Sequence, residues 1–196
     1  MLSCTTNLLF MKSFIILIVL NILVYDLTAQ NEKSLPFSPP PLGEMEGAFV
    51  GAWKGTLQWM VSGKPTKEFA MQLIIQPADT MGQYTWQIIY GDSGKVDNRP
   101  YLLKPVDTAK GHWVIDERDG IILDSYLHGN SFHGAFTVMG NTIVDNYTVN
   151  GDEMRVEFIS IKLDQKNTSG KGTDETPFVD SYKITSYQVG VLKRVK

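Results

Sequence analysis

Aromatic side chains that carry a polar atom are the main candidates for binding chemistry in this chain. An indole or a phenol combines an apolar body with a polar tip, which suits an amphipathic ligand. The same side chains could instead fill the interior of the domain or cover its outside. The candidate ligand-binding aromatic residues are Trp59, Tyr84, Trp86, Tyr90, Tyr101, Tyr126 and Tyr147.

Arg99 is the polar candidate that accompanies them. It lies in the sequence Asn98-Arg99-Pro100-Tyr101, where the proline limits a regular strand ladder. The guanidinium group is a fork-shaped donor that matches an anionic head group. We therefore expect Arg99 to orient the polar end of a ligand, and the alternative is a surface arginine paired with a nearby acid.

The three histidines, His112, His128 and His133, form no metal-binding motif. His128 and His133 flank the turn signal Gly129-Asn130, so they could lie on neighbouring strands, on the same face or on opposite faces. Ligation of a metal or of haem is one interpretation. The other is an ordinary surface or hydrogen-bonded histidine, and we accordingly expect neither a metal site nor a cofactor.

Patterns that support catalysis are missing from the sequence. It has no Gly-x-Ser-x-Gly elbow and no glycine loop of the kind that holds phosphates. One group of acidic residues does not follow the spaced order of a calcium loop, and we expect it to form a solvated turn. These residues are Asp116, Glu117, Asp119 and Asp124. We expect no catalytic residue, and a binding role rather than an enzyme.

The N-terminal segment is typical of an export signal. Lys12 precedes the apolar run 14–20, and small residues follow near Ala29. The run is shorter than the roughly 20 residues that a membrane span needs. We therefore expect residues 1–30 to be a signal peptide that is removed, giving a secreted or periplasmic protein with no stable membrane span. An uncleaved anchor is the alternative.

Composition limits the chemistry of the exported part. The only cysteine, Cys4, precedes the apolar run, so a cleaved chain has no thiol and no disulfide. The net charge of −3 leaves no basic stripe for nucleic acid, which we exclude as a partner. Residues 31–47 contain Pro36 and Pro39 to Pro41, and this composition predicts a flexible leader.

Residues 48–196 read as a single domain of short strands. Phe69, Met71, Leu73 and Ile75 alternate with more polar residues, which is the pattern of a half-buried strand. Together with segment 84–90 this strand predicts a hairpin, and segments 113–116 and 121–126 predict another across an Asp-Gly turn.

Further strands are expected at 132–138, 142–149, 154–161 and 181–193, and a polar loop at 164–176. The loop could be a mobile rim loop or could fold over an opening. Closure protects the edges of so many strands. The sequence therefore predicts an all-β, closed, antiparallel up-and-down barrel of about 8–10 strands, with a flat sheet or a two-sheet sandwich as the alternative.

The motif Gly51-Ala52-Trp53 and the basic pair Lys193-Arg194 near the C-terminus resemble the calycin superfamily, which includes the lipocalins. The resemblance implies a lipocalin-like barrel whose base is closed by Trp53 under a basic residue of the last strand, here Arg194. Glycine at position 51 is itself expected to let another backbone pass close by, because it has no side chain. The middle lipocalin motif, Thr-Asp-Tyr, has only a loose counterpart in Asp145-Asn146-Tyr147, so the fatty-acid-binding and nitrobindin-like branches stay open.

Three functions follow from these observations. The leading hypothesis is an exported binding protein that encloses a small hydrophobic or amphipathic molecule between aromatic walls. The second is a cell-envelope interaction module with a solid barrel, in which the leader and the polar loop contact another protein. The third is a nitrobindin-like haem protein, which requires an inward histidine.

Overall fold

The computed structural model describes residues 45, 47–91, 94 and 96–196. The expected signal segment 1–30 and most of the expected leader 31–47 lie outside the described residues. Met45, within the range expected to be leader, is only 1% exposed. Its carbonyl accepts a hydrogen bond of 3.0 Å from the Phe49 N–H. The packed part of the domain therefore includes a residue that precedes Phe49.

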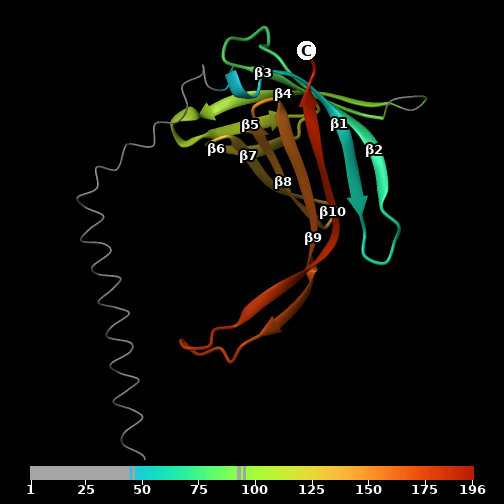
Figure 1. Cartoon of the computed structure of the whole chain (residues 1–196). Helices are drawn as coiled ribbons and strands as arrows, with labels where there is room; N and C mark the ends of the chain where they lie inside the picture. Colours follow the sequence, from blue (N-terminus) through green and yellow to red (C-terminus); the bar gives the residue numbers. More distant parts are fainter. Residues whose placement is uncertain (1–44, 46, 92–93, 95) are drawn as a thin grey trace, which may run out of the picture. The chain divides into compact units, whose positions relative to one another are not determined.

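Ten antiparallel strands form a closed barrel (Figure 1). Each strand pairs with its neighbours in the sequence, and β1 pairs with β10 to complete the ring. The strands are β1 Gly51–Met60, β2 Lys67–Ile75, β3 Tyr84–Tyr90, β4 Asp97–Asp107, β5 His112–Asp116, β6 Ile122–His128, β7 Ser131–Val138, β8 Asn141–Asn150, β9 Glu153–Ser169 and β10 Val179–Arg194. This architecture confirms the predicted all-β up-and-down barrel, and the flat-sheet and sandwich alternatives are wrong.

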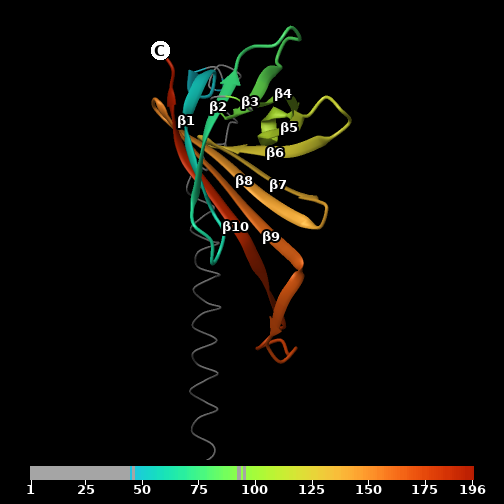
Figure 2. The same cartoon turned by 90° about the vertical axis from the view of Figure 1, so that its right-hand side faces the viewer.

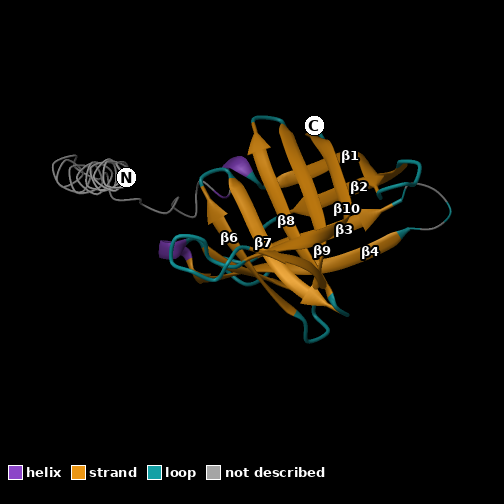
Figure 3. Cartoon of the chain, turned by 90° about the horizontal axis from the view of Figure 1, so that it is seen from below, coloured by secondary structure: helices purple, strands orange, loops and turns teal. Residues whose placement is uncertain are grey.

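Helical structure among the described residues is limited to short turns such as η1, Thr108–Lys110. None of these described helical segments has the length and apolar character needed to cross a membrane. Seen from below, the strands cross as they wrap around the interior (Figure 3). The interior is therefore formed by strand residues that point inward at every second position.

The predicted hairpins are present. In β2 the side chains of Met71, Leu73 and Ile75 are fully buried, and Leu73 faces Ile88 of β3. The β5 and β6 strands flank residues 117–121, which include the expected turn at 117–120. The period-two pattern of apolar residues therefore identified the inner face correctly.

Strand β4 was not predicted, because its prolines are unusual within a strand. Pro100 faces Gln87 of β3, and Pro105 faces Trp113 of β5. The register shifts between Pro105 and Asp107. Such an irregularity accommodates a residue that has no N–H to donate.

The structure corrects the expectation of a polar loop at 164–176. Strand β9 continues to Ser169 and pairs there with Val179 of β10, so only the tip is a loop. The two strands project from the barrel as a ribbon (Figure 1 and Figure 2). The polar residues are compatible with a strand because they pair across it: Asp180 accepts hydrogen bonds from Lys166 at 2.5 Å and Thr168 at 2.6 Å. The prediction of a loop is therefore wrong for residues 164–169, and the loop begins at residue 170.

Large apolar side chains fill one end of the barrel. Trp53 of β1 and Phe132 of β7 are completely buried there. Phe49 packs edge to face on Phe132, with ring centroids 4.9 Å apart. The segment that precedes β1 therefore contributes to the packing of this end.

Arg194 covers Trp53 from outside. Its guanidinium carbon lies 4.1 Å from the centre of the Trp53 ring, close enough for a cation–π interaction. The guanidinium also donates to the carbonyl oxygens of Val50 at 2.5 Å and Ala48 at 2.8 Å, and the Trp53 indole N–H donates to Phe49 at 2.9 Å. This end of the barrel is thus closed with both polar groups satisfied.

Gly51 leaves room for that arginine. Its φ angle is +147°, which favours glycine. A Cβ atom at this position would lie 2.7 Å from Nη1 of Arg194. The expectation that Gly51 admits a neighbouring backbone is therefore corrected, because an arginine side chain makes the close approach.

Candidate functional site

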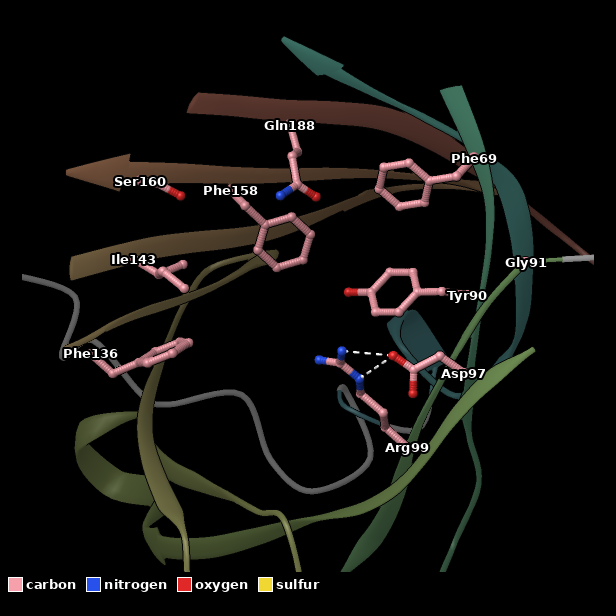
Figure 4. A pocket seen from close by; sticks show the side chains of 10 residues that line it. All are labelled: Phe69, Tyr90, Gly91, Asp97, Arg99, Phe136, Ile143, Phe158, Ser160 and Gln188. Carbon is pink, nitrogen blue, oxygen red and sulfur yellow. Dashed lines mark hydrogen bonds and ion pairs between the residues drawn. The ribbon is translucent and has the colours of Figure 1, made fainter. Parts of the chain in front are cut away.

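The barrel is hollow at the end away from Trp53. The cavity there has a volume of about 470 Å³, which lies within the usual range for small-molecule sites. The side chains around it converge on one space (Figure 4). The lining residues are Phe69, Tyr90, Gly91, Asp97, Arg99, Phe136, Ile143, Phe158, Ser160 and Gln188.

Most of the cavity wall is aromatic or aliphatic. Phe69 and Tyr90 meet edge to face with ring centroids 5.7 Å apart. Phe158 of β9 packs in the same manner against Tyr147, at 5.8 Å. Phe136 of β7 and the aliphatic Ile143 of β8 add apolar surface opposite Tyr90 (Figure 4). These surfaces suit an apolar ligand body.

Arg99 lies in the cavity wall and is paired with Asp97. Its Nε and Nη2 atoms donate to Oδ2 of Asp97 at 3.0 and 2.7 Å. The guanidinium carbon also lies 5.1 Å from the centre of the Tyr90 ring. Both interpretations of the sequence therefore apply to Arg99, which faces the cavity and pairs with a nearby acid. The hydrogen bond to Asp97 raises the pKa of Arg99, so its charge is permanent.

Two phenols lie beside this ion pair. Burial raises the pKa of Tyr90 to about 12, although the charge on Arg99 opposes the shift. Burial also raises the pKa of Tyr101, with a further contribution from Glu117. Both phenols are consequently neutral near pH 7. A neutral phenol can donate one hydrogen bond and accept others.

Asp145 occupies an inward position on β8 that sequence reasoning missed. The buried positions of β8 alternate through Asp145, Tyr147 and Val149, and the preceding position of that row is Ile143 in the cavity wall. Asp145 is 6% exposed. It faces Gly134 of β7, where a Cβ atom would overlap its Oδ1. Glycine at 134 therefore creates the space that the carboxyl group fills.

Trp86 and Tyr147 form a buried aromatic pair near this carboxyl group. Their ring centroids are 5.0 Å apart and the rings meet edge to face. The Trp86 indole N–H approaches Tyr147 but completes no hydrogen bond within the described part of the chain. Burial raises the pKa of Tyr147, and the Asp145 charge adds to that shift. Tyr147 thus places an aromatic ring beside Asp145 on the same face of β8, and Trp86 packs against that ring.

The other candidate residues lie away from the cavity. Tyr84 is 3% exposed and packs against Trp113 at 6.2 Å. Trp59 lines a separate hollow of about 280 Å³, where Lys67 lies 5.6 Å from its ring. Tyr126 is 40% exposed and stacks on His112 at 4.8 Å. Tyr90 and Arg99 are thus brought together, whereas these three are not.

Sequence reasoning missed several residues of the site. Phe69 was assigned to an inner face, but nothing distinguished it from residues that fill the core. Asp145 carried a clearer signal, because a carboxylate stood on the same face as Ile143 and Tyr147. A charged residue on the buried face of a strand is rare enough to be noticed.

The three histidines lie on the outer face of the barrel. Each is adjacent in sequence to a buried inward residue, namely Trp113, Leu127 or Phe132. His112 contacts Asp124 at 2.7 Å, and the rings of His128 and His133 are 5.7 Å apart. Within the described residues, no three side chains of the histidine, cysteine or acidic types converge as a metal would require.

Comparison with known proteins identifies the fold and nothing finer. No protein-family model and no curated protein matches the chain. A crystal structure of a DUF3598-family protein of unknown function from Nostoc punctiforme is similar, with a TM-score of 0.54 and 11% identity. The match covers 81% of this chain and 50% of that one, so the chain spans about half the length of the Nostoc protein. The two proteins share a barrel fold.

Proposed function

We propose that the barrel binds one small hydrophobic or amphipathic molecule in the cavity. The observation that carries this proposal is the cavity of about 470 Å³, whose walls are mainly aromatic and aliphatic and hold one ion pair. A pocket of that size with few polar groups is typical of small-molecule sites. The aromatic walls supply affinity, and the Arg99–Asp97 pair orients a polar group of the ligand.

The proposal extends to family and compartment. The stacking of Arg194 on Trp53 supports a calycin-like barrel, in agreement with the resemblance of the Gly51-Ala52-Trp53 motif. The apolar run within residues 1–30 supports export, so the protein acts outside the cytoplasm as a secreted or periplasmic protein. The haem alternative needs an inward histidine, and all three histidines lie on the outer face.

Binding is tested with Nile red, an uncharged fluorescent probe. The purified protein should increase its fluorescence, and native mass spectrometry after incubation with lipid extract should identify retained molecules. Ser160→Trp places a large side chain in the cavity and should abolish binding. Thr56→Trp adds the same side chain at an exposed position of β1 and should leave it unchanged. Equal binding by both variants contradicts the proposal.

The β9–β10 ribbon supports a second candidate, the cell-envelope interaction module. Phe178 and Val179 are 68% and 52% exposed there, and contiguous exposed apolar side chains are frequent at interaction sites. Deletion of residues 164–182 should then abolish capture of a partner from envelope extract, with an almost unchanged melting temperature. Capture that survives the deletion contradicts this candidate.

A further inference from the structure

Asp145 is the only buried carboxyl group among the described residues. The fold assigns it no structural role. Asp145 is 6% exposed and receives no hydrogen bond from another described side chain. Burial raises its pKa to about 6, and only its own backbone N–H opposes this shift. A buried carboxylate is costly unless a cation or several donors compensate it. Among the described residues, no basic side chain acts on the Asp145 carboxyl group.

Arg99 does not fill that role. It lines the cavity, and Asp145 is buried behind two other lining residues, Ile143 on its own strand and Phe158 across from it. The charge of Arg99 is already paired with Asp97 through two hydrogen bonds, and it does not contribute to the pKa of Asp145. The neighbours of Asp145 across the strands are Gly134 and Phe158. The charges of Arg99 and Asp97 therefore compensate each other, whereas no described cation compensates the Asp145 carboxylate.

Aromatic rings lie beside the Asp145 carboxyl group. Phe158 and Tyr147 pack edge to face beside it, at 5.8 Å, and Trp86 packs on Tyr147 at 5.0 Å. Tyr90 is close enough for the charge on Asp145 to act on its phenol. Ring faces attract organic cations, and a carboxylate among aromatic rings is a favourable setting for an ammonium group.

We propose that the ligand carries an ammonium group, which forms an ion pair with Asp145 inside the aromatic cavity. The inference rests on the proposed function and specifies the ligand as an amphipathic amine. The apolar part of the amine lies against Phe69, Phe136 and Ile143. An anionic amphiphile is disfavoured, because it would place a second negative charge beside Asp145 with Arg99 already paired.

Three probes with the same alkyl chain test the head group: dodecylamine, 1-dodecanol and dodecanoate, each below its micelle concentration. Displacement of Nile red from the purified protein at about pH 7.5 gives their affinities. We expect dodecylamine to bind at least about tenfold more tightly than 1-dodecanol, as for a desolvated charge pair. Equal affinity, or tighter binding of dodecanoate, overturns the inference while leaving the proposed function intact.

Failure of Nile red and all three probes to bind has a different meaning, because it contradicts the proposed function and the inference together. Asp145→Asn removes the charge with little change in volume. It should reduce dodecylamine affinity about tenfold and leave that of 1-dodecanol unchanged. Asp174→Asn, at an exposed residue of the ribbon tip, should change neither. A dodecylamine preference that persists in Asp145→Asn overturns the assignment of Asp145.

The pH dependence gives a readout that needs no variant. Dodecylamine stays protonated between pH 5 and 8, whereas Asp145 gains a proton as the pH falls through about 6. Proton competition should therefore weaken dodecylamine binding about tenfold between pH 7 and pH 5. The facing phenols of Tyr90 and Tyr147 stay neutral over this range. Because 1-dodecanol is uncharged, the pH dependence of its binding measures any effect that pH exerts through Arg99, Asp97 or the fold. Equal pH profiles for the two probes overturn the inference.

Discussion

Two regions of the barrel differ in whether their buried polar groups have hydrogen-bond partners. At the closed end the Trp53 indole donates to Phe49, and Arg194 donates to backbone carbonyls. Between this end and the cavity, Asp145 and the Trp86 indole N–H have no such partner on another described residue. Native proteins satisfy most buried polar groups, and exceptions occur at functional sites. This difference is expected if the closed end serves stability and the hollow end serves the ligand that we propose.

The largest expected effect concerns the closed end. Trp53→Ala should reduce the free energy of unfolding by about 3–5 kcal/mol, because it removes a fully buried indole. Since domains are stable by about 5–15 kcal/mol, this loss is severe. Trp59→Ala, at a residue that is 37% exposed, should cost about 1–2 kcal/mol. Urea denaturation of both variants measures the difference, and equal losses would remove the distinction between the two ends.

Asp145→Asn should have the opposite sign. The folded-state pKa of about 6 lies above the ordinary value of 3.8, so the fold loses stability as the pH rises from about 4 to 6, and the loss is complete above pH 6. At about 1.4 kcal/mol per pH unit, the variant should gain up to about 3 kcal/mol at pH 8. The gain should shrink as the pH falls through 6 and vanish near pH 4. Denaturation at several pH values measures it, and a variant destabilised at pH 8 contradicts an uncompensated carboxylate.

A smaller effect measures the contact between Arg194 and Trp53. Arg194→Ala forfeits the stacking at 4.1 Å and the bonds to Val50 and Ala48, but it leaves a smaller void than Trp53→Ala. A double-mutant cycle should give a coupling energy of about 0.5–3 kcal/mol. Additive losses in urea denaturation would show that the two side chains close the barrel independently.

The sequence predicted the barrel better than it predicted the cavity. Alternation along β2 and β3 was sufficient for strands and hairpins, because a strand with one buried face must repeat every two residues. The same alternation cannot tell a residue that fills the core from one that lines a space. Tyr84 and Tyr90 lie on the same face of β3, but only Tyr90 reaches the cavity.

The failures have physical reasons of their own. Strand β4 was not predicted because it contains Pro100 and Pro105. Whether a strand tolerates a proline depends on how that strand pairs, and only the tertiary structure defines the pairing. The ribbon was concealed by its polar composition, which is compatible with strands because Lys166 pairs with Asp180. Asp97, the partner of Arg99, was missed for a related reason: the sequence shows that an acid is near, but not which face of the strand it shares.

The smallest expected effect on stability belongs to the ion pair at the hollow end. The Arg99 and Asp97 side chains are 44% and 53% exposed, and pairs so accessible to water contribute about 0–1 kcal/mol. Arg99→Gln should therefore change the free energy of unfolding by less than about 1 kcal/mol, and by less still in 1 M salt.

The same variant should nevertheless weaken probe binding, because Arg99 lines the cavity and packs on Tyr90 at 5.1 Å. Urea denaturation and 1-dodecanol displacement of Nile red, carried out on one preparation, separate the two effects. Arg118→Gln, in the exposed turn between β5 and β6, serves as the control and should alter neither. A large loss of stability with unchanged binding would place Arg99 with the structural residues of the closed end, and the division between the two ends would fail at this position.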